Sequence, residues 1–125
     1  LIFATMHSRD AKGAISRITD LFPQSSQFEI RSQLAFGLRA VISQHLLPSV
    51  VVGDKRELAL EVMFNSLPIA AAIRTGKIES IDNNIQTGKS DGMYLLDDSI
   101  RDLMIDGRIT RETALKFVSD ARNLG

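Results

Sequence analysis

Near Asn65 the hydrophobic residues of this sequence change from a period of two to one of about 3.6, and this change limits the folds that the chain can adopt. Before Asn65 the apolar side chains alternate with other residues, a pattern typical of a β-strand; they are Leu58, Leu60, Val62 and Phe64. After Asn65 they recur about every 3.6 residues, as in helices, up to the end of the chain. We therefore predict two regions: residues 1–65, which contain the strands, and residues 66–125, a small helical subdomain.

A short apolar run, Leu1–Thr5, opens the sequence and leads into polar residues. It predicts a strand that is buried on both faces and ends in a loop, and we interpret Leu1 as a point inside a fold. Helical spacing begins at Ala11, and Pro23 stops that helix. Because sites in α/β proteins often lie at strand ends, His7 is a candidate: an imidazole can donate a hydrogen bond to a phosphate oxygen. Judged by its position alone, His7 is better explained as a loop histidine that makes a structural hydrogen bond.

A second, longer helix is predicted from Ser25 or Ser26, either of which can cap it, to a point before Pro48. Its apolar stripe consists of Leu34, Leu38, Val41 and Ile42. His45 is expected near the end of this helix, where packing explains it better than metal binding, because two histidines without cysteines make a poor ligand set.

A β-hairpin is predicted next, because Val50–Val52 lead into the turn sequence Gly53-Asp54-Lys55 and the alternating strand follows. In the helical region, glycines mark the breaks between helices, and Thr110 is a suitable N-cap. Two apolar stripes are expected there: Leu96, Ile100, Leu103 and Met104, and then Ala114, Phe117, Val118 and Ala121.

Charge and composition exclude several classes of function. Fifteen Lys and Arg residues balance fifteen Asp and Glu residues and there is one Tyr, so no basic or aromatic surface favours nucleic acid. The absence of Cys removes disulfides, thiolate nucleophiles and Cys-ligated zinc. The apolar runs are shorter than the about 20 residues that cross a bilayer, so no transmembrane segment is predicted. No metal site is predicted, and the clustered charges should form a solvated helix face: Asp97, Asp98, Arg101, Asp102 and Asp106.

The tripeptide Gly88-Lys89-Ser90 copies the end of a phosphate-binding loop, G-x-x-x-x-G-K-[ST]. The rest of that motif is missing, because Asn83 stands where the first glycine belongs and the residues before it are too polar for a buried strand. We therefore predict a turn at a helix end rather than a phosphate site.

Short motifs spread over almost the whole chain carry a family resemblance. The chain opens with Leu-Ile-Phe-Ala-Thr-Met-His-Ser, and residues 38–48 read Leu-Arg-Ala-Val-Ile-Ser-Gln-His-Leu-Leu-Pro. Further motifs lie in the helical region: Ile85–Gly88, Gly92-Met93, Leu96-Asp97 and Gly107–Ala114. Together they resemble the PilT-type ATPases that power type IV pilus retraction, relatives of the type II and type IV secretion ATPases, in which a histidine box usually reads Ala-Thr-Leu-His-Thr.

The resemblance implies an α/β fold: the C-terminal part of a RecA-like P-loop ATPase core, followed by a small all-helical subdomain. It implies a homo-hexameric motor for pilus retraction and twitching motility, which is cytoplasmic, peripheral to the inner membrane and docked on the pilus platform protein. ATP and Mg²⁺ are the implied cofactors. His7 would be the catalytic, nucleotide-sensing residue, and Thr5 and His7 would contact the phosphate end. The family's phosphate loop, metal-binding acidic segment and catalytic glutamate precede this strand, so the chain alone should not hydrolyse ATP.

One motif departs from the family pattern. Retraction motors carry Ala-Ile-Arg-Asn-Leu-Ile-Arg-Glu before Gly-Lys, whereas here Ala70 and Ala71 replace the first Arg and the Asn, and Arg74 keeps the second Arg. The alternative that the protein is a related secretion ATPase therefore stays open. The absence of Cys favours the retraction branch, because pilus-assembly and type II secretion ATPases usually carry a four-cysteine zinc insertion. A freestanding helical interaction module also stays open, while zero net charge disfavours a DNA-handling domain.

Overall fold

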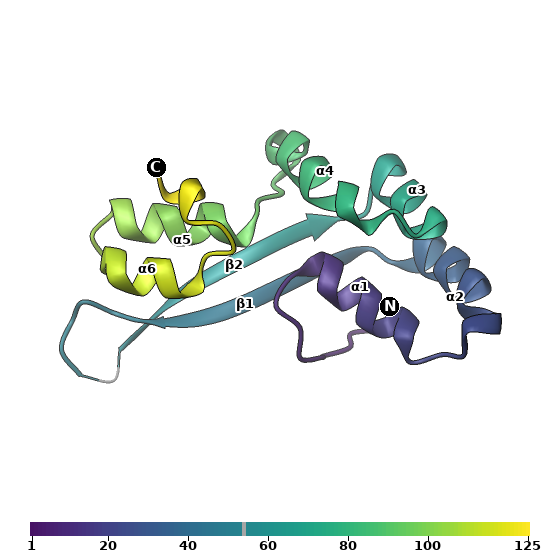
Figure 1. The fold of residues 1–125 in the computed structure, drawn as a ribbon, viewed down its shortest axis with the longest axis horizontal. Helices are drawn as coiled ribbons and strands as arrows, with labels where there is room; N and C mark the ends of the chain where they lie inside the picture. The colour runs from purple at the N-terminus through teal and green to yellow at the C-terminus, as the bar shows by residue number, and fades with distance from the viewer. Residues whose placement is uncertain (54) are drawn as a thin grey trace.

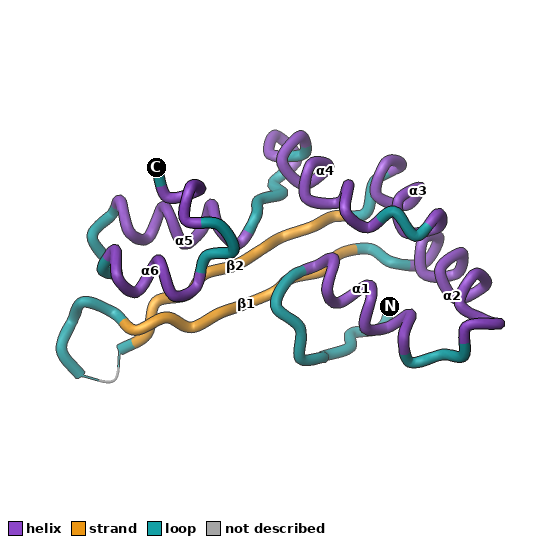
Figure 2. The backbone as a smooth tube through the Cα atoms, viewed as in Figure 1, coloured by secondary structure: helices purple, strands orange, loops and turns teal. Residues whose placement is uncertain are grey.

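The computed structural model, which describes residues 1–53 and 55–125, is built around one long β-hairpin with helices grouped at its two ends (Figure 1). The strands β1 (Ala40–Pro48) and β2 (Arg56–Phe64) are antiparallel. Ala40 lies opposite Phe64 and Pro48 opposite Arg56, so the two strands pair along their full lengths. Figure 2 shows that the rest of the described chain consists of helices and loops.

Helices precede and follow the hairpin in the sequence. Two of them precede it, α1 (Ala11–Asp20) and α2 (Gln24–Gly37), and Asp10 caps α1 by accepting a hydrogen bond from the Gly13 amide. Those that follow are α3 (Leu67–Thr75), η1 (Ile78–Ser80), α4 (Ile81–Thr87), η2 (Lys89–Asp91), α5 (Leu96–Ile105), α6 (Arg111–Phe117) and η3 (Ala121–Leu124). The predictions of a helix from Ala11, of helices after Asn65 and of the Thr110 cap are confirmed. The domain division at residue 65 stays a prediction.

The buried apolar residues form two separate clusters, one at each end of the hairpin. The first cluster joins α1 to α4 with the end of β2, and its members are Ala11, Ile15, Ala35, Met63, Ile69, Ala72, Ile73, Ile81, Ile85 and Met93. The second joins α5, α6 and η3 with the other end of the hairpin, and its members are Leu47, Ala59, Leu96, Ile100, Leu103, Ile109, Ala114 and Leu124. The chain therefore has two apolar cores that share one sheet.

The two faces of the hairpin differ in an unusual way. On β2, the side chains of Glu57, Ala59, Glu61 and Met63 point inward and are buried, so two carboxylates lie among the helices. On the opposite face, aliphatic side chains are exposed to solvent: Ile42, Leu46 and Leu58. The inward face thus combines apolar contacts with polar groups that need partners.

The predicted buried strand at Leu1–Thr5 is wrong in this structure. Residues 1–8 have no regular secondary structure, and Leu1, Ile2 and Phe3 are exposed by 89% or more. A strand is stable only when its backbone groups bond to neighbouring strands. In the described part of the chain, β1 and β2 are the only paired strands, and neither lies beside this segment as a partner.

The predicted second helix is right in its first half and wrong in its second. It begins at Gln24, after Pro23, so the prediction that Ser25 or Ser26 caps it is also wrong. It ends at Gly37, and Val41 and Ile42 belong to β1. β-branched side chains favour the extended backbone, and the carbonyl of Leu34 is the last to accept a helical bond, from the Leu38 amide. His45 consequently lies on a strand and not at a helix end. Residues 50–52 are outside the strands, and the predicted turn includes Asp54, which lies outside the described residues.

Candidate functional site

Thr5 and His7 lie together on the irregular segment that leads into α1, and both side chains are exposed. The Arg17 guanidinium on α1 donates a hydrogen bond to the His7 carbonyl over 2.9 Å, which holds the backbone of this segment against the helix. An exposed imidazole and a hydroxyl can both donate to phosphate oxygens. The chemistry of both side chains is therefore compatible with the predicted contact to a nucleotide phosphate, which stays a prediction.

The segment between His7 and α1 is anchored to both strands and to α5. The His45 Nε2 atom on β1 lies 2.8 Å from the Arg9 carbonyl oxygen, and because a carbonyl can only accept, Nε2 carries the proton. The Glu61 Oε1 atom on β2 accepts from the Ala11 amide at 2.8 Å. The Arg9 guanidinium contacts the Asp97 carboxylate on α5 at 3.5 Å. Three elements thus contact two residues of this short stretch, Arg9 and Ala11.

Glu61 is the most buried of the polar groups near this segment. Its second oxygen, Oε2, accepts from the Leu96 amide at 3.1 Å, so one carboxylate binds the first residues of both α1 and α5. Burial raises the pKa of Glu61, and the negative charges of Asp10 and Asp82 raise it further, while the two amide hydrogen bonds oppose this. This role could not be predicted directly from the sequence, where its only signal is the two-residue period that places Glu57 and Glu61 on one face of a strand.

Asp97 is buried and does not form a solvated face, which corrects the prediction for this residue. Its carboxylate accepts from the Ser119 amide at 2.9 Å, the Ser119 hydroxyl at 2.7 Å, the Asp120 amide at 3.3 Å and the Asn123 side chain at 2.8 Å. Burial alone would raise the pKa of Asp97, but these hydrogen bonds, led by those from Ser119, lower it. Asp97 therefore fastens the C-terminal segment to α5.

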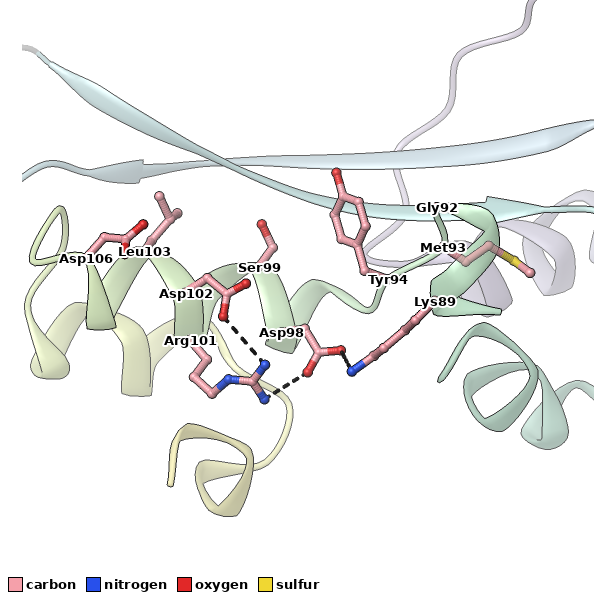
Figure 3. Close-up of a pocket in the computed structure, with 10 residues that line it drawn as sticks. All are labelled: Lys89, Gly92, Met93, Tyr94, Asp98, Ser99, Arg101, Asp102, Leu103 and Asp106. Atoms are coloured by element: carbon pink, nitrogen blue, oxygen red, sulfur yellow. Dashed lines mark ion pairs between the residues drawn. The ribbon is translucent and has the colours of Figure 1, made fainter. Parts of the chain in front are cut away.

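A surface groove of about 480 Å³ lies between η2 and α5, and several of the charged groups that line it pair with one another (Figure 3). Asp98, also buried and thus also contrary to the prediction, contacts Lys89 at 3.0 Å and Arg101 at 2.9 Å. Gly88 ends α4, so the predicted helix-end turn at Gly88-Lys89-Ser90 is confirmed. Lys89, Asp98, Arg101 and Asp102 in this groove pair with one another, and neither Thr5 nor His7 lines it.

Other classes of site find no support in residues 1–53 and 55–125. No three His, Asp or Glu side chains in this part of the chain come close enough to hold a metal ion. Within the same residues, none of the helices combines the length and the apolar character needed to cross a bilayer.

Comparison with known proteins gives consistent relatives, although no protein-family model matches the sequence. The chain is 38% identical to the type IV pilus retraction ATPase PilT of Pseudomonas aeruginosa over 114 residues, which are 91% of this chain and 33% of that protein. It is 33% identical to a twitching motility protein of Neisseria gonorrhoeae over 124 residues, 99% of this chain and 33% of that one. The chain thus spans about a third of the length of these relatives.

A solved structure agrees with these relatives. The crystal structure of the pilus retraction motor PilT with bound ADP superposes with a TM-score of 0.81 and 31% identity, over 95% of this chain and 32% of that chain. The hairpin with its helical groups is the arrangement found in the C-terminal part of that ATPase fold. The relatives and the solved structure together support a PilT-type secretion ATPase, of whose fold this chain represents a C-terminal portion.

Proposed function

We propose that the whole protein is a motor ATPase that couples ATP hydrolysis to type IV pilus retraction and so drives twitching motility. The likeness to the ADP-bound retraction motor PilT, at a TM-score of 0.81 and 31% identity over 95% of this chain, carries this proposal. The two sequence relatives support the same function, since they are a retraction ATPase and a twitching motility protein.

Within that motor, Thr5 and His7 approach the phosphate end of ATP. The nucleotide, with Mg²⁺, supplies the phosphoryl-transfer chemistry when bound, and the groups that grip it most firmly belong to the family's preceding segments. His7 senses the state of the nucleotide by donating a hydrogen bond to a phosphate oxygen, which is stronger when the acceptor carries charge. The chain alone is therefore inactive, and its contribution is to detect the nucleotide and to pass the signal on.

The motor acts as a homo-hexamer at the cytoplasmic face of the inner membrane, docked on the pilus platform protein. These features are proposed from the family membership and from the functions of the relatives.

A related secretion ATPase is the second candidate, because Ala70 and Ala71 stand where retraction motors carry Arg and Asn. Both alanines lie half-buried on α3, and the exposed Arg74 follows them one turn later. Restoration of twitching in a strain that lacks its retraction motor separates the two functions. A protein with full ATP turnover that does not restore twitching belongs to another secretion system.

The test of the nucleotide role is His7→Ala in the full-length protein. Loss of the imidazole donor should lower ATP turnover sharply, by about 10²-fold or more if it stabilises charge on the transferred phosphate. Turnover is measured by phosphate release, and hexamer formation by light scattering.

Two neighbouring substitutions serve as the matched control, Met6→Leu and Ser8→Thr, which restore the family's usual residues on either side of His7. They should leave turnover within about twofold of the wild type, since neither removes a donor to phosphate. Unchanged turnover in His7→Ala, with the hexamer intact, would remove His7 from the mechanism.

A further inference from the structure

Between the two apolar cores, the inward face of the hairpin carries a band of polar residues. Ser43 lies opposite Glu61 in the strand register, and both are buried, while His45 is the next inward residue on β1. The cluster that contains α1 lies on one side of this band, and the cluster that contains α5 lies on the other. Glu61 is therefore positioned where the two cores meet.

Glu61 accepts a hydrogen bond from the first amide of two helices, α1 and α5. The first amides of a helix have no partner within it, and this end of the helix attracts negative charge. At α1 the carboxylate accepts from Ala11, and at α5 it accepts from Leu96, where no capping side chain bonds to the helix start. Each carboxylate oxygen accepts from one of the two amides, so a single side chain joins the two helix starts.

The charged groups around Glu61 come from every element packed on it, and most are paired. Lys12 of α1 contacts Asp82 of α4 at 2.6 Å, and Arg9 contacts Asp97 of α5 at 3.5 Å. Asp10 is occupied as the cap of α1. None of these pairs connects the amide of Ala11 to that of Leu96, whereas Glu61 bonds to both. The Arg9–Asp97 pair is a second, longer contact between the two helix starts, made by a partly exposed guanidinium.

We propose that Glu61 is a positioning residue for His7: it fixes the start of α1, and with it the preceding segment, to the start of α5. This inference rests on the proposed role of His7 at the nucleotide. Between Ala11 and His7 lie three residues, and the middle one, Arg9, is held by His45 at its carbonyl and by Asp97 at its guanidinium. A displacement of His7 by nucleotide therefore reaches Glu61 through a short, anchored segment, and Glu61 passes it to the second core. The same link sets where His7 stands when nucleotide arrives.

The experiment compares Glu61→Gln, His7→Ala and the double variant in the full-length protein. Glutamine keeps the volume but presents an NH₂ group to one of the two amides, so one link is lost. We expect kcat for ATP to fall about tenfold with little change in KM, because a misplaced catalytic group costs rate more than binding. In the His7→Ala background, Glu61→Gln should cause no further fall in kcat.

Glu57→Gln is the matched control. Glu57 is also a buried, inward carboxylate on β2, but it bonds to the Ser49 hydroxyl at 3.0 Å and pairs with Lys55 and Arg108, away from residues 9–11. The kcat of the Glu57→Gln variant should stay within about twofold of the wild type. An equal fall in kcat for Glu57→Gln and Glu61→Gln would mean that burial of charge, and not positioning, explains the effect, and would overturn the inference.

The outcomes separate this inference from the proposed function. If His7→Ala lowers turnover but Glu61→Gln does not, or if the two effects multiply in the double variant, Glu61 does not act through His7. If His7→Ala itself leaves turnover unchanged, the role of His7 fails first, and the positioning role fails with it.

A second measurement uses the wild-type protein and does not depend on the folding of a variant. Amide hydrogen exchange at Ala11 and Leu96 is followed with and without ADP. Since one carboxylate accepts from both amides, their protection should change together when the nucleotide binds. A change at one amide without the other would overturn the inference.

Discussion

Replacing Asp97 by Asn should release the C-terminal segment of the chain from α5. The segment after α6 is irregular up to η3, and the Asp97 carboxylate accepts hydrogen bonds from two of its backbone amides and two of its side chains. Asparagine has nearly the same shape, so the substitution removes the charge and one acceptor without opening a cavity. The effect therefore measures the polar contacts of Asp97, which are its hydrogen bonds to this segment and its pairing with Arg9, and no loss of packing.

The expected loss of free energy depends on which hydrogen-bond donors can reorient toward the asparagine side chain. The Ser119 hydroxyl and the Asn123 amide can turn to meet the new NH₂ group, but the Asp120 backbone amide, 3.3 Å from Oδ2, cannot. A hydrogen bond to a charged group contributes about 1.5–3 kcal/mol, so losing one and weakening the others should cost about 2–3 kcal/mol. That cost corresponds to roughly 30- to 150-fold faster opening of the segment.

Native-state hydrogen exchange measures this opening at amides that do not touch Asp97. The Val118 amide bonds to Ala114 and the Asn123 amide to Asp120, so both report the segment as a whole. Asp102→Asn is the control, because Asp102 lies on the same helix with its side chain 68% exposed. If Asp97→Asn changes exchange at these amides by less than about threefold, the hydrogen bonds at Asp97 do not hold the segment, and this reasoning is wrong.

Two further predictions concern acid and packing. Because the pKa of Asp97 is lowered in the folded protein, its stabilising contribution is present above its usual 3.8 and is lost as pH falls through the folded value. The exchange difference between the wild type and Asp97→Asn should therefore stay constant from about pH 7 to 5 and shrink in stronger acid; growth of this difference in acid would contradict it. Gly88→Ala should destabilise the protein by about 1–3 kcal/mol, because the new methyl group would overlap the buried Met93 side chain. Gly37→Ala, where no atom lies within 4 Å, is the control, and equal thermal midpoints would refute the clash.

Local sequence patterns predicted the helices well wherever the nearest neighbours decide the structure. The helix from Ala11, the cap at Thr110 and the apolar stripe of α5 all follow from spacing within one or two turns. The boundary between α2 and β1 did not, because Leu34, Leu38 and Val41 fit a helical stripe although a strand begins at Ala40. Only pairing with β2 decides that conflict.

Burial of charge could not be predicted from the sequence for a similar reason. The partners of Glu61 lie 50 and 35 residues away along the chain, and those of Asp97 lie 22 or more residues away. Without these partners, an aspartate at helical spacing is indistinguishable from one on a solvated face. The strand at Leu1–Thr5 failed because a strand depends on neighbours that the local pattern does not contain.

Part of the hairpin reverses the usual distribution of side chains, in which apolar groups are buried and charged groups are exposed. Its carboxylates on the inward face are buried, whereas three of its aliphatic side chains are exposed to solvent: Ile42, Leu46 and Leu58. A bare aliphatic row of this kind tends to adhere to other apolar surfaces. Work to keep the isolated chain in solution should therefore begin with polar replacements on the aliphatic side and leave the acidic side untouched.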